Sequence, residues 1–161
     1  FLDAASTLVS LNPDLESTES SQNTTSTISS DQVIAQTFLQ GQKLFNDKQY
    51  DEALKTIEPL KEMLDHANDG FKAKFYGNLA VILSAKGNYD EAIQNYQIAI
   101  KFNQAPESLL AGLFVNLGIA LRKKSRFQEA FQVFQTGLSL KNINDSIKQK
   151  LWFHMALLYA P

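Results

Sequence analysis

Apolar residues recur every three or four positions through residues 31–161, which is the spacing of helices that bury one face. Small and polar residues such as Gly87 and Asn88 interrupt this pattern at intervals. The pattern predicts seven consecutive helices that begin near residues 31, 50, 75, 89, 106, 127 and 145. The chain is therefore expected to be all-α over this range.

Individual residues sharpen the expected helix ends. Pro59 is expected to kink the second helix, because proline lacks the backbone N–H that a helix interior uses. Asp69 and Asp145 are expected to cap the third and seventh helices with their side-chain oxygens. The seventh helix is expected to reach Ala160 and is apolar nearly all round, so we expect another element to cover it.

The first thirty residues have a different composition. In residues 1–15 the apolar side chains, including Phe1, Leu8 and Leu11, fall largely on one helical face, which predicts an amphipathic peptide or helix. Residues 16–30 are mostly serine, threonine and other polar residues, with a single isoleucine. So little apolar surface does not offset the entropy of ordering, and a flexible linker is expected there. Residues 31–161 then form the main domain.

Short sequences return at a fixed interval in this domain. YDEA at 50–53 recurs at 89–92, and FQEA follows at 127–130, so the repeats lie 39 and 38 residues apart. A small residue precedes each of these alanines by twelve positions, as Gly41, Ala80 and Gly118. Ala156 falls where a fourth unit would place it. Such a period predicts stacked helix pairs that bury one continuous core.

The order of large and small residues resembles the tetratricopeptide repeat family. The second unit carries the resemblance best, through Tyr76, Leu79, Ala80, Leu83, Gly87, Tyr89, Ala92, Tyr96 and Ala99. The resemblance implies a right-handed superhelical solenoid of antiparallel helix pairs, with units at about 34–68, 73–105 and 111–143 and a partial unit at 149–161. The family's usual unit has about 34 residues, so the longer units here are expected to alter the pitch of the superhelix.

The family lines a concave groove with the first helix of each unit, and its positions carry over to this chain. They are Phe38, Gln42, Lys74, Asn78, Val81, Val115, Asn116, Ile119, Lys123, Phe153 and His154. Members that bind chaperone C-termini hold a carboxylate with a lysine and an asparagine, which Phe38 and Gln42 replace in the first unit, so that role is not expected.

The remaining groove is mostly apolar and carries two amides in matching register, Asn78 and Asn116. An amide both donates and accepts, so it pairs with a ligand backbone of any sequence, and the apolar positions suit an amphipathic segment. The alternative is that these residues contact neighbouring helices and the amides face water. Similarly, the cations from Arg122 to Arg126 either attract an acidic ligand or complement a helix end.

Composition narrows the classes of function. The net charge of −2 gives no reason to expect nucleic acid, and the absence of cysteine excludes disulfides and thiolate metal sites. Two distant histidines do not suggest a metal site, no cofactor motif occurs, and no apolar run is long enough to span a membrane. No nucleophile, base and orienting group stand together, so an enzyme is not expected. An intracellular protein, cytoplasmic or nuclear, fits best.

The sequence therefore predicts a protein-interaction module, a scaffold or adaptor that binds a short amphipathic or acidic segment in its groove. Residues 1–15 are one candidate for that segment. A second hypothesis is a structural module that self-associates through residues 1–15 or 151–160. A third is the peptide-sensing part of a regulator.

Overall fold

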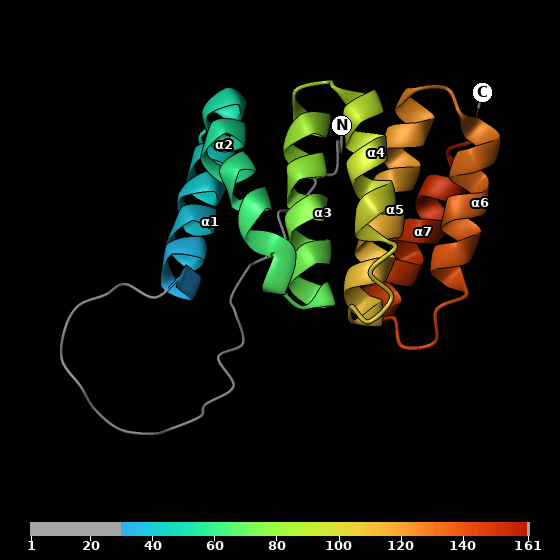
Figure 1. The fold of residues 1–161 in the computed structure, drawn as a ribbon. Coiled ribbons are helices and arrows are strands. Elements are labelled where there is room, and N and C mark those ends of the chain that lie inside the picture. The colour runs from blue at the N-terminus through green and yellow to red at the C-terminus, as the bar shows by residue number, and fades with distance from the viewer. Residues whose placement is uncertain (1–29, 161) are drawn as a thin grey trace, which may run out of the picture.

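The computed structural model describes residues 30–160 (Figure 1). Its helices follow one another as α1 (Ser30–Asn46), α2 (Tyr50–Ile57), η1 (Glu58–His66), α3 (Asp69–Ala85), α4 (Tyr89–Ala99), α5 (Glu107–Lys123), α6 (Phe127–Leu138) and α7 (Asp145–Ala156). The predicted amphipathic segment 1–15, with Phe1, Leu8 and Leu11, lies outside the described residues, as does all of the predicted linker except Ser30.

Consecutive helices pair along the chain, α1 with α2, α3 with α4 and α5 with α6. In Figure 1 the pairs stand beside one another in chain order, from α1 and α2 at one end to α6 and α7 at the other. Each pair also contacts the next one, and α7 packs on both α5 and α6. This arrangement confirms the predicted all-α solenoid, because successive pairs bury one continuous apolar core.

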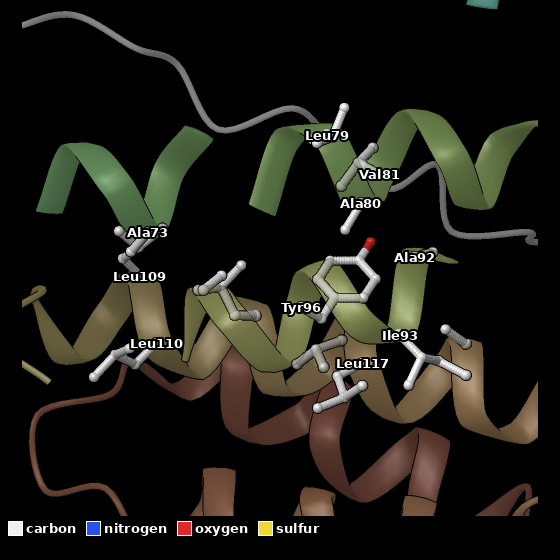
Figure 2. Packing of buried hydrophobic residues seen from close by; sticks show 14 of the residues in the cluster. Ala73, Leu79, Ala80, Val81, Ala92, Ile93, Tyr96, Leu109, Leu110 and Leu117 are labelled. Carbon is white, nitrogen blue, oxygen red and sulfur yellow. The ribbon is translucent and has the colours of Figure 1, made fainter. Parts of the chain in front are cut away.

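Small residues allow the paired helices to approach, and aromatic rings fill the space beside them. Ala80 on α3 and Ala92 on α4 are fully buried, and so is the ring of Tyr96 on α4. Figure 2 shows this ring between the two helices, below Ala80. In the next pair Gly118 of α5 lies directly against the ring of Phe134 of α6. The recurring small and aromatic positions are thus the contacts that set the helix spacing.

Acidic residues at the starts of the longer helices tie each unit to the loop that follows it. The Asp69 carboxylate accepts a hydrogen bond from the backbone N–H of Gln104 at 3.4 Å. Glu107, which occupies the same register one unit later, accepts from the N–H of Asn142 at 2.8 Å. These bonds bridge segments 35 residues apart in sequence, and each ties the start of a helix pair to the loop that follows the pair.

Two ion pairs repeat in the same way at the other end of the helices. Lys86, directly after α3, pairs with Asp51 of α2. Lys124, directly after α5, pairs with Asp90 of α4 at 2.9 Å. The bond to Lys86 also lowers the pKa of Asp51. Asp51 and Asp90, which lie in the first turns of α2 and α4, therefore join neighbouring units.

The second helix differs from its prediction. The α-helical part ends at Ile57, and the chain continues as the 3₁₀ helix η1 with Pro59 in its first turn. Proline lacks the N–H that would continue the α-helical ladder, and its ring excludes the carbonyl one turn back. The result is a change of helix type instead of a kinked α-helix.

The predicted caps were each displaced by one residue. The side chain of Asn68, not Asp69, accepts from the N–H of Phe71 at 2.8 Å. In the same way Asn144, not Asp145, accepts from the N–H of Ile147 at 2.9 Å. Both asparagines have the extended backbone of a capping residue, whereas both aspartates are already helical.

The seventh helix is shorter than predicted, because it ends at Ala156 and does not reach Ala160. It starts in the same register as α3 and α5, yet it spans 12 residues where they span 17. The last turns of α3 and α5 carry the buried residues Leu83 and Leu121. A final turn without such packing has little to stabilise it, since most helical stability in proteins comes from the packed face.

Candidate peptide-binding surface

The longer helix of each pair lies on the inner side of the stack. These helices, α1, α3, α5 and α7, are called the A helices, and α2, α4 and α6 the B helices. Neighbouring A helices contact each other directly, α3 with α5 and α5 with α7, so they approach more closely than the B helices. The predicted groove residues all lie on A helices, which makes this side the place to examine them.

Their exposure divides the predicted groove residues into two groups. Five are buried within the chain, namely Phe38, Asn78, Val81, Val115 and His154. Six reach the surface, of which Lys123 and Phe153 are exposed and Gln42, Lys74, Asn116 and Ile119 are half-buried. The second group is the one that offers contact area to a separate ligand.

Phe38 has a structural role in the stack. Its ring makes edge contacts with Phe71 and Phe75 of α3, with ring centroids 5.6 and 5.8 Å apart. Phe75 is itself fully buried, so these rings form the packing between α1 and α3. This residue belongs to the inter-unit core and not to the predicted groove.

His154 also packs inward, and it leaves an unsatisfied polar atom. Its ring stacks on Phe134 of α6 at a centroid distance of 6.1 Å. Burial lowers the pKa of His154, and the charges of Arg122 and Lys150 lower it further. Within residues 30–160, His154 Nδ1 and Arg122 Nε are buried without a hydrogen-bond partner. Two polar atoms within electrostatic reach of each other thus have unused hydrogen-bonding capacity.

The accessible predicted residues concentrate on α5 and α7. Asn116, Ile119 and Lys123 lie three or four positions apart on α5, so they share one face of that helix. Lys150 and Phe153 form the corresponding stripe on α7, and both are exposed. The helices α5 and α7 are in contact, and we call their two stripes together the A-helix surface. It combines apolar side chains, an amide and two cations.

Comparison with known protein families agrees with this architecture. Residues 71–142, which run from α3 to just beyond α6, match the family model of the tetratricopeptide repeat. Residues 71–142 contain tetratricopeptide repeats. Such repeats are generally protein-interaction modules. A search of curated proteins finds no significant match to this chain.

The basic cluster after α5 is mostly engaged in contacts between and within the tetratricopeptide units. Lys124 pairs with Asp90, and Arg126 forms two hydrogen bonds to Glu129 at 2.7 and 2.6 Å. The second pair raises the pKa of Arg126 and lowers that of Glu129. Two of the cations therefore form ion pairs within the fold, a role that the sequence did not predict, and Lys123 lies on the A-helix surface.

A cavity that the sequence did not predict lies at the other end of the tetratricopeptide stack. Its volume is about 600 Å³, and it opens between the start of α1, the end of η1 and the start of α3. Its lining is mainly apolar and comprises Ser30, Asp31, Ile34, Ala35, Met63, His66, Ala67, Asn68 and Phe71. In the sequence, Pro59 is the residue that bears on this cavity. It lies in the first turn of the 3₁₀ helix η1, and the winding of η1 places Met63 and His66 in the lining.

The described part of the chain has two further properties that bear on function. No group of three or more histidine, aspartate or glutamate residues within it has the arrangement of a metal site. None of its helices is long and apolar enough to cross a membrane.

Proposed function

We propose that the chain is a scaffold or adaptor that binds a short amphipathic or acidic protein segment on its A-helix surface. The observation that carries the proposal is the composition of that surface. Exposed Phe153 and half-buried Ile119 offer apolar contact, while Lys123 and Lys150 surround them with positive charge. A segment with an apolar stripe and acidic flanks complements both properties.

The unsatisfied atoms beneath the surface favour an acidic group in the ligand. Arg122 Nε is a donor, and His154 Nδ1 also donates when the imidazole is protonated. A ligand carboxylate on the surface above them would offset the repulsion among His154, Arg122 and Lys150. Binding of such a group would therefore raise the pKa of His154 and strengthen as the pH falls toward that value.

Residues 1–15 are the candidate ligand that the sequence itself supplies. Their apolar stripe includes Leu8 and Leu11, and Asp3, Asp14 and Glu16 provide acidic flanks. A tether of the length of residues 16–30 gives an effective concentration on the order of millimolar. In this proposal the segment occupies the A-helix surface of its own chain until a competing partner displaces it.

Fluorescence anisotropy with a labelled peptide of residues 1–16 tests this function. The full chain is compared with the double variant Leu8→Asp/Leu11→Asp, which removes the apolar stripe from the tethered copy. The variant should bind the added peptide about tenfold more tightly or better, because its own segment no longer competes. Adding Lys150→Glu to the double variant should then weaken binding.

The matched control is Lys101→Glu, which makes the same charge change at an exposed position after α4, on the B-helix side. It should leave peptide binding unchanged. If the parent and the double variant bind the peptide equally, residues 1–15 are not the occupant. If Lys101→Glu weakens binding as much as Lys150→Glu, the A-helix surface is not the binding site.

We further propose a binding role and not a catalytic one. The A-helix surface carries cations and an amide but, among its described residues, no nucleophile placed beside a general base.

A further inference from the structure

Glycines inside the helices of the stack mark close contacts, with one exception. A Cβ atom at Gly41, Gly77, Gly118 or Gly137 would lie only 2.1–3.0 Å from a side chain of another helix. These four positions require glycine, because the neighbouring helix leaves no room for a side chain. Around the place where a Cβ of Gly112 would lie, by contrast, no neighbouring atom of residues 30–160 comes within 4 Å. Helix packing therefore does not explain the missing side chain of Gly112.

A glycine at this position weakens the helix that contains it. Gly112 is in the interior of α5, beyond its first turn, where glycine is the least favourable residue after proline. The packed glycines offset this cost through the close approach of two helices, whereas Gly112 gains no such contact. A helix position that stays open without a packing reason is typical of a place where a ligand approaches the backbone.

Gly112 extends the α5 stripe of the A-helix surface. It precedes Asn116 by four residues, so the two lie on the same face of α5, and it is half-buried. The closest approach of α3 to α5 lies beside it, where the Cβ position of Gly77 is 2.6 Å from the side chain of Leu113. The helix α5 also contacts α7, and it lies between α3 and α7 in the stack (Figure 1).

A lysine occupies the register of Gly112 on each of these two neighbouring helices. Lys74 of α3 lies 38 residues before Gly112, and Lys150 of α7 lies 38 residues after it. Lys74 is half-buried and Lys150 is exposed. The ion pairs of residues 30–160 involve neither of the two ammonium groups. The open position at Gly112 therefore has an available cation on either side.

We infer that Gly112 forms a subsite for an acidic side chain of the bound segment, which lies over the α5 backbone between Lys74 and Lys150. The inference rests on the proposed function, because it assigns a place to the acidic part of that ligand. Glycine leaves the space open, and the two ammonium groups supply charge-assisted hydrogen bonds to an aspartate or glutamate. Lys74 thereby becomes a specificity-determining residue on α3, outside the two stripes of the A-helix surface.

Binding of the labelled peptide of residues 1–16 tests this subsite. The reference protein is the full chain with Leu8→Asp/Leu11→Asp, so that its own segment does not compete. Lys74→Gln removes one of the two cations and should weaken peptide binding by about threefold to fivefold. Gly112→Leu fills the open position with a side chain and should weaken binding by about tenfold or more.

Two matched controls separate these effects from general changes of the protein. Lys72→Gln removes the same charge from another half-buried lysine of α3, on a different face of the helix, and should leave the affinity unchanged. Gln97→Leu adds a leucine at an exposed position of α4 and should likewise have no effect. Circular dichroism should show Gly112→Leu to be folded and no less stable than the reference, because the position is open.

A double-mutant cycle identifies the bound carboxylate. The candidates in the peptide are Asp3, Asp14 and Glu16, which are replaced one at a time as Asp3→Asn, Asp14→Asn and Glu16→Gln. One of these peptides should bind the reference protein about threefold less tightly than the unmodified peptide. The same replacement should cost little in Lys74→Gln, because the pair that it removes is already broken there.

Several outcomes would overturn the inference. One is an equal loss of affinity in Lys72→Gln and Lys74→Gln, and another is full affinity in Gly112→Leu. A third is a cycle in which no carboxylate of the peptide is coupled to Lys74. Binding that responds to Lys150→Glu but not to Lys74→Gln or Gly112→Leu contradicts the subsite alone and leaves the proposed function standing. Absence of peptide binding to every variant contradicts both.

Discussion

Exposure separates residues of the A helices that the repeat pattern treats alike. Phe38 and Phe153 occupy the same register in the first and last units, yet Phe38 is enclosed by Phe71 and Phe75 while Phe153 is 55% exposed. The difference arises because α3 packs beside α1, whereas no helix follows α7 within residues 30–160. A residue at a groove position therefore contributes to binding only where no neighbouring ring covers it.

Two glycines of α5 give a direct test of packing at the residue scale. A methyl group at Gly112 would point into open space, whereas at Gly118 it would collide with the ring of Phe134. We expect Gly112→Ala to raise the free energy of unfolding by about 0.5–1 kcal/mol through helix propensity. Gly118→Ala should instead lower the free energy of unfolding by about 1–2 kcal/mol. The cost of the collision with Phe134 exceeds the gain in helix propensity.

Urea denaturation of both variants measures these changes. The two substitutions are chemically identical and lie on the same helix, so their difference isolates the contact with Phe134. Equal stabilisation by both would show that α5 and α6 separate without cost, which would contradict the packing described above.

At the scale of elements, the turns inside the helix pairs share one backbone geometry. Lys48, Gly87 and Ser125 occupy equivalent positions between α1 and α2, α3 and α4, and α5 and α6. All three have positive φ, of 60°, 86° and 58°. Glycine adopts this conformation without strain, whereas residues with a Cβ do not. The sequence signalled this turn only at Gly87.

We therefore predict that Ser125→Gly stabilises the protein. The left-handed conformation costs a non-glycine residue roughly 1–2 kcal/mol, and the entropy of glycine in the unfolded chain offsets part of the gain. The free energy of unfolding should rise by up to about 1 kcal/mol, measured by urea or thermal denaturation. Gly87→Ala is the converse variant and should destabilise. A loss of stability in Ser125→Gly would mean that its side chain has a role at this turn.

At the scale of the whole molecule, the units are joined by equivalent contacts that repeat in register. The ion pairs of Lys86 and Lys124 each connect one unit with its neighbour, and the carboxylates of Asp69 and Glu107 each connect the start of a unit with the loop that ends it. Each contact lies near solvent, so the apolar core supplies most of the stability. The contribution of the polar contacts is to hold the angle between units, and with it the position of α7 beside α5.

Glu107 and Asp145 allow the contribution of this carboxylate hydrogen bond to be measured. Both begin an A helix in the same register, so both interact with the helix dipole, but only Glu107 accepts a backbone N–H from the following loop. Glu107→Ala should cost about 0.5–1.5 kcal/mol more than Asp145→Ala in the free energy of unfolding. Chemical denaturation provides the comparison. Equal losses would show that the bond to Asn142 adds nothing beyond the dipole effect.

The repeat pattern alone was sufficient for the family and the architecture. Small residues such as Ala80 and Gly118, and aromatics such as Tyr96 and Phe134, must recur together if helix pairs are to stack at a constant spacing. Helix periodicity is a local property, so the sequence also placed most helices correctly. It was less accurate at their ends, where Asn68 and Asn144 took the capping positions predicted for their neighbours.

Only the tertiary structure decided which face of each helix is covered, and by what. Periodicity identifies an apolar face, but it does not reveal whether that face meets another helix, as at Phe38 and His154, or solvent, as at Trp152. The same holds for the end of α7, because the stability of a last helical turn depends on a packing partner that no local pattern encodes. Whether a helix face is buried depends on which other helices the fold packs against it. For this reason the candidate binding surface could be identified only from the tertiary structure.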